Sequence, residues 1–447
     1  MQFKNGLFNF ILLCILFINL NHDGLAFAQD SLTLEEALHL ARQNNLQIKK
    51  QRMDQAVAQL ERKVQKANRL PAMEVSLSSS YFSKVNEIDL SQTIGIPGRR
   101  VALGGHDRTE FLLALRQPIF TGSRLQSQVA LAENSLLAEE AKFEVLTNEV
   151  YHQIYLLFYK AQNLWNQKKI LQTSLKRLNV QLENVRNLYE AAQAMAFDTL
   201  QVYNQILAMG IEQQNNALQM KLSNLQMAHL LDLPSVRPIA ESELERPLDK
   251  LAALPQLRQE AMEKRAELKT LGLARQNALI QKKLARSTFY PTIFGQVNLH
   301  YAKPGLDPVT NDWMNYYSLG VNLQWNLWRW QGDQRKVEQA QLIHNRLQLE
   351  ERELQNRISL QVEESYEKLQ FSRQQWQLAE ELQAQQEERF RIISAQHQND
   401  VASTNELISA EADLTRSELQ TQQALINYYL NLASLKYALG TLVEFDK

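Results

Sequence analysis

Two periods of hydrophobic and polar positions alternate along the chain, and they appear in the same order in each half. One period is a long heptad pattern, in which apolar residues recur in steps of four and three at Leu171, Leu175, Leu178, Leu182, Val185 and Tyr189. Such a pattern predicts helices that pack as coiled coils. The pattern and the turns that interrupt it indicate two long helical hairpins, over about 123–231 and 332–440.

The other period is two residues, which is typical of strands. It predicts strands at about 73–83, 109–120, 291–302 and 315–327, and it is cleanest in the last two. Each segment has about ten residues, the length of a tilted strand in an outer membrane. Aromatic residues gather at the segment ends, as they do at membrane interfaces. The alternative is a pair of soluble hairpins with an aromatic core.

An internal repeat connects the two halves. Residues 41–71 resemble residues 261–291, a shift of 220, and later the shift falls to 208, so that Asp198 aligns with Glu406. The first copy therefore carries about 12 extra residues, which fall between its two strands. We expect a first repeat at 29–232, a linker at 233–253 and a second repeat at 254–447.

Residues 1–28 have the features of a secretory signal peptide. Lys4 is followed by an apolar stretch over 7–20, and Ala26-Phe27-Ala28 is a small-x-small cleavage site. The alternative is an uncleaved membrane anchor. Cys14 is the single cysteine and lies inside this segment, so the mature chain is expected to carry no thiol. After it, no apolar run reaches roughly 18 residues, so we expect export without a transmembrane helix.

Composition narrows the function further. The formal net charge of −1 argues against bulk nucleic-acid binding. The eight histidines are scattered, and no Walker loop, nucleophile elbow or paired-acid site stands out. We therefore expect a protein that is not an enzyme and has no cofactor, no metal site and no nucleic-acid partner.

Two strands in each repeat make four in each chain. Four strands cannot close a barrel around a pore, and open sheet edges are not tolerated in lipid. The sequence therefore predicts an oligomer, and three chains would supply twelve strands.

Several short motifs, in order, resemble those of the TolC-like outer-membrane efflux family over nearly the whole mature chain. They are residues 32–38 (LTLEEAL), Leu70-Pro71, residues 115–122 (LRQPIFTG), Tyr290-Pro291, residues 324–332 and residues 439–442 (LGTL). The resemblance implies a mainly α fold with a small β part, assembled as a homotrimer. It further implies a 12-stranded barrel in outer-membrane lipid and a coiled-coil helical tunnel in the periplasm. The expected function is a passive exit duct of a tripartite efflux or type I secretion system, whose partners are a periplasmic adaptor and an inner-membrane pump or ABC transporter.

The resemblance also directs attention to the hairpin tips. Family members carry an acid six residues after a glycine, and Asp198 and Glu406 match these acids, whereas Ala192 and Asp400 replace the glycines. We expect the acids to form a negative ring at the tunnel mouth. Their alternative roles are a helix N-cap for Asp198 and a solvated first-turn acid for Glu406.

Other residues near the tips complete the candidate site. Candidate gate partners of the acids are Arg186, Arg389 and Arg391. The alternative is that these arginines are ordinary surface charges. Candidate adaptor contacts are Ala192, Met195, Asn399 and Asp400. Competing functions are a periplasmic coiled-coil adaptor or scaffold without a barrel, and a surface adhesin. No motif indicates whether the cargo is a drug, metal, polysaccharide or protein.

Overall fold

The structure is a computed structural model that describes residues 31–89, 100–247, 252–307, 309–399 and 401–442. The predicted signal peptide and Asp400 lie outside the described residues. In chain order the elements are α2 (Leu34–Asn44), α3 (Leu46–Ala67), β1 (Ala72–Tyr81), β2 (Asn86–Asp89), β3 (Arg100–Leu103), β4 (Asp107–Phe120), α5 (Arg124–Glu190), α6 (Ala196–Leu230), α7 (Leu254–Lys264), α8 (Ala266–Arg286), the 3-10 turn η1 (Ser287–Phe289), β5 (Thr292–Lys303), β6 (Met314–Gln324), α9 (Gly332–Gln398) and α10 (Thr404–Leu439).

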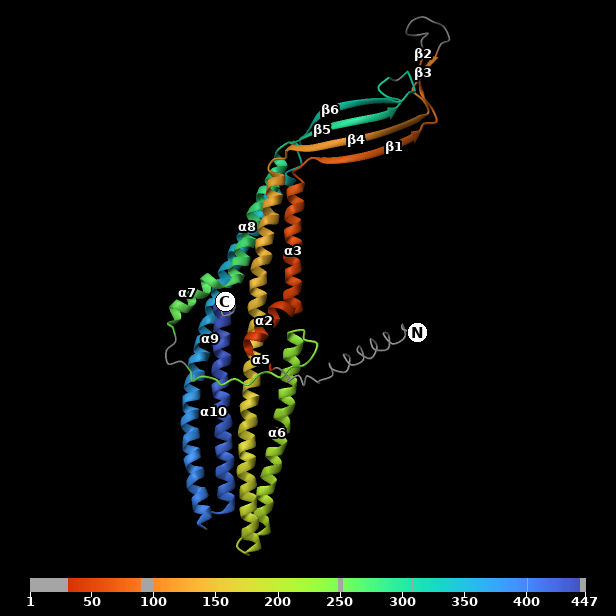
Figure 1. The fold of residues 1–447 in the computed structure, drawn as a ribbon. Coiled ribbons are helices and arrows are strands. Elements are labelled where there is room, and N and C mark those ends of the chain that lie inside the picture. Colours follow the sequence, from red (N-terminus) through yellow and green to blue (C-terminus); the bar gives the residue numbers. More distant parts are fainter. Residues whose placement is uncertain (1–30, 90–99, 248–251, 308, 400, 443–447) are drawn as a thin grey trace, which may run out of the picture. The chain divides into compact units, whose positions relative to one another are not determined.

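The chain divides into two compact units. The helical unit contains the described parts of residues 1–48, 147–258 and 362–447, and the sheet unit contains those of 49–146 and 259–361. The helices α5 and α9 have 67 residues each and run through both units. At 1.5 Å per residue each is about 100 Å long. In the helical unit α5 turns back into α6, and α9 turns back into α10 (Figure 1).

The sheet unit holds one antiparallel sheet of four strands in the order β1-β4-β5-β6. The strands of the first repeat thus lie beside those of the second, with β4 paired to β5. Between β1 and β4 the chain forms a separate small hairpin, β2–β3, in the place where the sequence predicts the extra residues. The strand β6 ends at Gln324, which pairs with Thr292, the first residue of β5. Residues 325–327, which were predicted to belong to this strand, therefore lie outside it.

Strand register separates the sheet into two chemically different faces. One cross-strand row is Val75, Leu113, Leu299 and Tyr317, and the next row along the strands on the same face is also apolar. The opposite face carries Glu110, His300 and Ser318, in which the two imidazole nitrogens lie 2.6 Å from the Glu110 carboxylate and 3.0 Å from the Ser318 hydroxyl. The apolar side chains are exposed in the single chain: Leu319 keeps 70% of its surface. Strand chemistry therefore leaves an apolar sheet face without cover within the described chain.

The helical unit has its core along the predicted heptad seam. Leu171, Leu178 and Val185 are buried, as that pattern requires. Leu175 and Tyr189 differ from the prediction, because Leu175 is only half-buried and Tyr189 is exposed. The buried residue between Leu171 and Leu178 is instead a polar one, Ser174, whose hydroxyl faces a carboxylate of α10.

Thr33 and Glu36 have the spacing of a capping box at the start of α2, and one of the two hydrogen bonds of that motif forms. The Thr33 hydroxyl accepts a hydrogen bond from the Glu36 backbone N–H at 3.2 Å. The Glu36 carboxylate pairs with Arg237 at 2.6 Å, and this ion pair replaces the return bond of a capping box. Within the described residues, none of the helices is both long and apolar enough to span a bilayer.

Candidate functional site: the hairpin tips and a buried ion-pair cluster

The first hairpin turns over an alanine in the left-handed conformation. Ala192 has φ 58°, and the two backbone bonds around it are Ala192 N–H to Tyr189 O (3.0 Å) and Gln193 N–H to Leu188 O (2.8 Å). This pair of bonds is a Schellman motif, which favours glycine at the left-handed position because a Cβ is strained there. Ala192 therefore keeps the geometry of the family's glycine without its conformational freedom.

Asp198 closes the first turn of α6. Its carboxylate accepts a hydrogen bond from the Met195 backbone N–H at 2.9 Å. Because α6 begins at Ala196, Asp198 is its third residue. Met195, not Asp198, occupies the N-cap position, which was the alternative role expected for Asp198. The Met195 side chain points into solvent, with 74% of its surface exposed.

Glu406 occupies the same third position in α10. Its carboxylate accepts hydrogen bonds from the Ser403 backbone N–H (2.7 Å) and hydroxyl (2.8 Å), while the Glu406 N–H donates to the Ser403 hydroxyl (3.3 Å). These bonds hold the pKa of Glu406 below its usual value, so the exposed carboxylate stays ionised at neutral pH. Asn399 caps the preceding helix end through its amide, which donates to the Ala395 carbonyl at 2.8 Å.

The arginines expected to close onto these acids have other partners in this chain. Arg389 pairs with Asp413 of α10 at 2.8 Å, and Arg391 pairs with Glu388, one turn away, at 2.6 Å. Hydrogen bonding to Arg391 lowers the pKa of Glu388. Arg186 is exposed on α5. The structure therefore brings neither Arg389 nor Arg391 into a recorded pair with Asp198 or Glu406.

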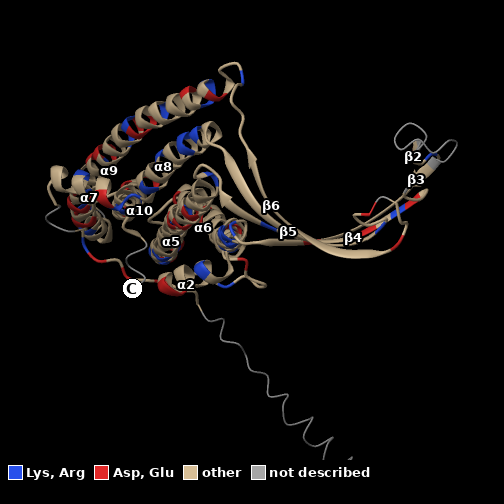
Figure 2. Ribbon diagram, turned by 90° about the horizontal axis from the view of Figure 1, so that it is seen from above, with Lys and Arg blue, Asp and Glu red and all other residues tan. Residues whose placement is uncertain are grey.

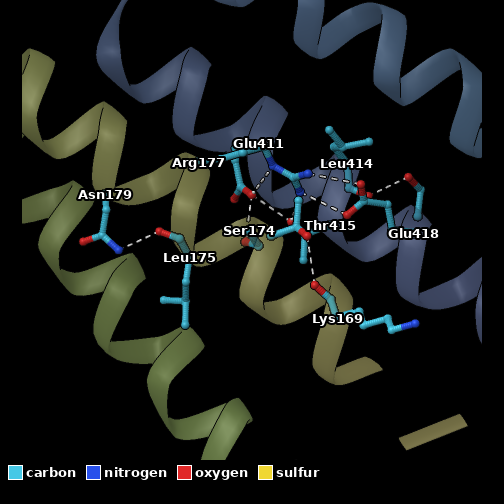
Figure 3. Close-up of polar contacts among 11 residues, drawn as sticks. Lys169, Ser174, Leu175, Arg177, Asn179, Glu411, Leu414, Thr415 and Glu418 are labelled. Carbon is cyan, nitrogen blue, oxygen red and sulfur yellow. Dashed lines mark hydrogen bonds and ion pairs between the residues drawn. The ribbon is translucent and has the colours of Figure 1, made fainter. Parts of the chain in front are cut away.

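A buried ion-pair cluster connects the two hairpins, and its residues were not among those expected from the sequence. Arg177 of α5 forms two nearly parallel bonds with the Glu418 carboxylate of α10, at 3.0 and 3.2 Å. Its Nε also donates to Glu411 at 3.2 Å, and that same Glu411 oxygen accepts from the hydroxyls of Ser174 and Thr415, each at 2.8 Å (Figure 3). One acid of α10 is thus held by three donors from two helices.

Burial makes this cluster energetically important. The Glu411 side chain is 1% exposed and that of Arg177 is 20% exposed. Burial alone would lower the pKa of Arg177, but the hydrogen bond and charge of Glu418, together with Glu411, outweigh it and raise the pKa. A sequence signal for the cluster exists: Glu411 and Thr415 interrupt the apolar seam of Leu407, Ala410 and Leu414. Their partner, more than 230 residues away, is not visible in that pattern.

Among the residues that the structure describes, no three His, Cys, Asp or Glu side chains gather as a metal site. Apart from the buried cluster, the polar groups at the tips serve helix caps and surface pairs. The chain thus combines two repeated helical hairpins with one four-stranded sheet.

Comparison with known proteins identifies the family. The sequence model of the family described as outer membrane efflux protein matches residues 37–232 and 257–441. The chain belongs to this family, and the two matched segments contain the two hairpins. No curated protein sequence matches the chain.

Solved structures share the fold at low sequence identity. The outer membrane protein VceC of Vibrio cholerae aligns with a TM-score of 0.75 at 16% identity, over 91% of this chain and 96% of that one. A membrane protein from Pseudomonas aeruginosa gives 0.75 at 15%, over 91% and 93%. The open-state MtrE outer membrane channel of Neisseria gonorrhoeae gives 0.73 at 15%, over 92% and 89%.

The alanine turn generates a stability prediction. Ala192→Gly should stabilise the first tip by about 1 kcal/mol, because glycine removes the left-handed strain. Urea unfolding followed by far-UV circular dichroism of the purified protein would measure the change. Ala191→Gly, one residue earlier and outside the left-handed region, is the control and should be neutral or destabilising. Equal effects of the two substitutions would contradict the explanation.

The buried cluster generates a second prediction. Arg177→Met should destabilise the helical unit by about 3–5 kcal/mol, because it leaves the Glu411 charge buried without compensation. Adding Glu411→Gln to Arg177→Met should recover a part of that loss. Thermal unfolding of both variants would test this, with Arg391→Met, which removes an exposed pair, as the control expected to change little. The interpretation fails if Arg177→Met and Arg391→Met are equally mild.

Proposed function

We propose that this chain is the outer-membrane exit duct of a tripartite efflux or type I secretion system. Three copies form one conduit, which conducts cargo passively from a periplasmic adaptor and an inner-membrane pump or ABC transporter to the exterior. Membership of the outer membrane efflux protein family supports the location and the direction of transport. The energy comes from the pump, so the duct itself needs no catalytic group.

The single observation that carries the proposal is the sheet. Its strands are apolar on one face and polar on the other, and β1 and β6 each pair on one side only within the described chain. A sheet edge in lipid exposes N–H and C=O groups that nothing satisfies. Pairing β6 of one copy with β1 of the next, three times around, gives a closed barrel of twelve strands. The apolar rows then face lipid and the polar rows face the conduit.

Exposed apolar stripes on the helices also support the presence of further copies. Apolar side chains repeat along an uncovered side of α6, at Leu200, Leu207, Ile211, Leu218 and Leu225. A second exposed set lies on α9, at Leu360, Phe371, Leu378 and Leu382. Stripes of this kind are covered in coiled coils by a neighbouring helix. A trimer supplies that neighbour to each copy and completes the helical tunnel.

The hairpin tips are the proposed gate and docking end. Three copies of Asp198 and Glu406 make a ring of negative charge at the tunnel mouth, which favours cations. Arg389 and Arg391 pair with Asp413 and Glu388 of the same chain, so these two arginines have partners other than the tip acids. The adaptor is proposed to contact the exposed turn residues Ala192, Met195 and Asn399, together with Asp400, which lies outside the described residues.

The location and assembly are tested by two adjacent substitutions in β1. Leu77→Arg places a charge on the apolar face and should reduce heat-modifiable trimers in the outer membrane, with a cost of about 2–4 kcal/mol near mid-bilayer. Ser76→Arg places the same charge on the polar face and should be tolerated. Membrane fractionation and unheated gel electrophoresis give the readout. If carbonate extracts the protein from the membrane fraction and both substitutions are tolerated, the protein is instead a periplasmic adaptor or scaffold.

The gate is tested in planar bilayers. The double variant Asp198→Asn and Glu406→Gln removes the charge of the ring while keeping oxygen acceptors for the helix caps. Cation selectivity should fall and the closed state should become less frequent, since the ring potential is lost. Glu183→Gln, an exposed acid of α5 away from the turn, is the control. Unchanged selectivity together with unchanged closure would exclude the ring as the gate.

A further inference from the structure

A cavity of about 350 Å³ lies between the two hairpins of the helical unit. One wall is a face of α5, on which Arg177, Gln181 and Asn184 follow one another in steps of four and three. The other side is lined by α9, through Phe390 among others, and by the buried Leu407 of α10. Small-molecule sites have volumes of roughly 300–1,000 Å³, so the cavity is large enough for a small ligand.

Two polar residues, Ser174 and Gln181, interrupt the buried seam of α5. They stand in the same steps of three and four as Leu171, Leu178 and Val185. The Ser174 hydroxyl donates to a carboxylate of α10 at 2.8 Å. Gln181 is only 6% exposed, and within the described chain its amide nitrogen has no acceptor. A buried N–H without an acceptor is unfavourable, whereas a leucine at this position would simply extend the apolar seam.

The donor that lacks an acceptor lines the cavity, and a second donor lies one helical turn away. A guanidinium has five N–H groups, and four of those of Arg177 donate to side chains of α10. The Arg177 guanidinium also lies over the Phe390 ring, 5.9 Å from its centroid. Gln181 and the remaining N–H of Arg177 therefore favour a ligand that carries acceptor oxygens.

Charge narrows the class of ligand further. Basic and acidic residues are interspersed along α9 as a whole (Figure 2), but the cavity is lined by no Asp or Glu. The carboxylates of Glu411 and Glu418 engage Arg177 and are not among the lining residues. Lys176 is exposed at the cavity, and its ammonium has no ion pair within the described chain. An anionic ligand would supply that partner, whereas a cation would be repelled.

We infer that the cavity between α5 and α9 binds a small organic carboxylate with an apolar body. The carboxylate accepts a hydrogen bond from the Gln181 amide and is attracted by Lys176. The body packs against Val180, Phe390 and Leu407, which are the apolar lining residues. Such a ligand contacts both hairpins and holds them together. The inference goes beyond the proposed function, because it concerns a ligand of the helical unit and not the cargo of the conduit.

Calorimetric titration with naphthalene-2-carboxylate tests the site on the full-length protein in a neutral maltoside detergent. Saturable binding of one molecule per chain is expected. Gln181→Leu should raise the dissociation constant about tenfold, because the buried donor is lost. Without ligand, this variant should unfold at the same or a higher temperature than the wild type, since leucine continues the seam. Gln172→Leu, an exposed residue of α5 outside the cavity, is the control and should leave the affinity unchanged.

The neutral analogue naphthalene-2-carboxamide tests the charge. It has nearly the same shape and an acceptor oxygen, so it should bind the wild type several-fold more weakly than the carboxylate does. In Lys176→Gln this difference should largely disappear, because the attraction to the ammonium is lost. Equal affinity of the wild type for both compounds would overturn the assignment of an anionic ligand.

A substitution at the mouth of the cavity tests its position. Val180 is 60% exposed, so Val180→Trp can fill the opening without disturbing the core, and it should abolish binding. Gln172→Trp adds the same ring elsewhere on α5 and should not. The carboxylate should also raise the unfolding temperature of the wild type, and this shift should vanish in Val180→Trp.

Two results would overturn the site. Binding that Gln181→Leu, Lys176→Gln and Val180→Trp all leave unchanged would place the compound elsewhere on the protein. Absence of binding at millimolar concentration would mean that water satisfies Gln181 or that another copy of the chain covers the cavity. Neither result bears on the sheet, so the proposed duct is tested separately by the substitutions in β1.

Discussion

The open edges of the four-stranded sheet are the constraint on which the other features depend. In β1 and β6 one side of each backbone is paired, and the other side presents N–H and C=O groups to whatever lies beside it. In water these groups are hydrated, but in lipid they must be paired by protein. Because one face of the sheet is apolar, water is an unfavourable environment for much of it. Because the edge strands are unpaired, lipid is an unfavourable environment for a single chain. The proposed closed assembly of three copies would satisfy both requirements.

The same constraint explains why the helices can be so polar and so long. In the proposed trimer each helix needs only a narrow apolar seam toward its neighbours within the chain, because further copies would cover its second side. Buried polar contacts such as those of Arg177 with Glu411 and Glu418 join α5 to α10 at one point along the two helices. A seam of leucines alone permits sliding by a heptad, whereas a buried charge pair has one favourable alignment.

Local pattern was sufficient to predict the architecture, and it failed where partners are distant in sequence. The period-2 segments and the heptads predict four strands and two long hairpins, because each pattern repeats over many residues. The change in repeat shift predicts extra residues between β1 and β4, but not that they pair as β2 and β3. By contrast, the exposure of Tyr189, the core position of Ser174 and the pairing of Glu36 with Arg237 depend on residues that no local pattern connects. At the tips, the acids were predictable as a matched pair, while the partners of Arg389 and Arg391 were not.

The comparison of the two repeats gives the last step of the argument. Where both copies keep the same residue type in the same geometry, as with Asp198 and Glu406 at the third position of their helices, the shared feature begins a helix. Such a feature is required by the fold, whatever else it does. Where the copies share a backbone and differ in chemistry, as at Gly122 and Trp330, the packing differs: a Cβ at Gly122 would lie 2.7 Å from the Tyr290 Cβ, whereas the Trp330 side chain is exposed. The first turn therefore needs glycine for its packing, while the second turn places the Trp330 ring against that of Trp328. Comparison of the two repeats thus separates the residues that the shared backbone requires from the residues that differ between the copies.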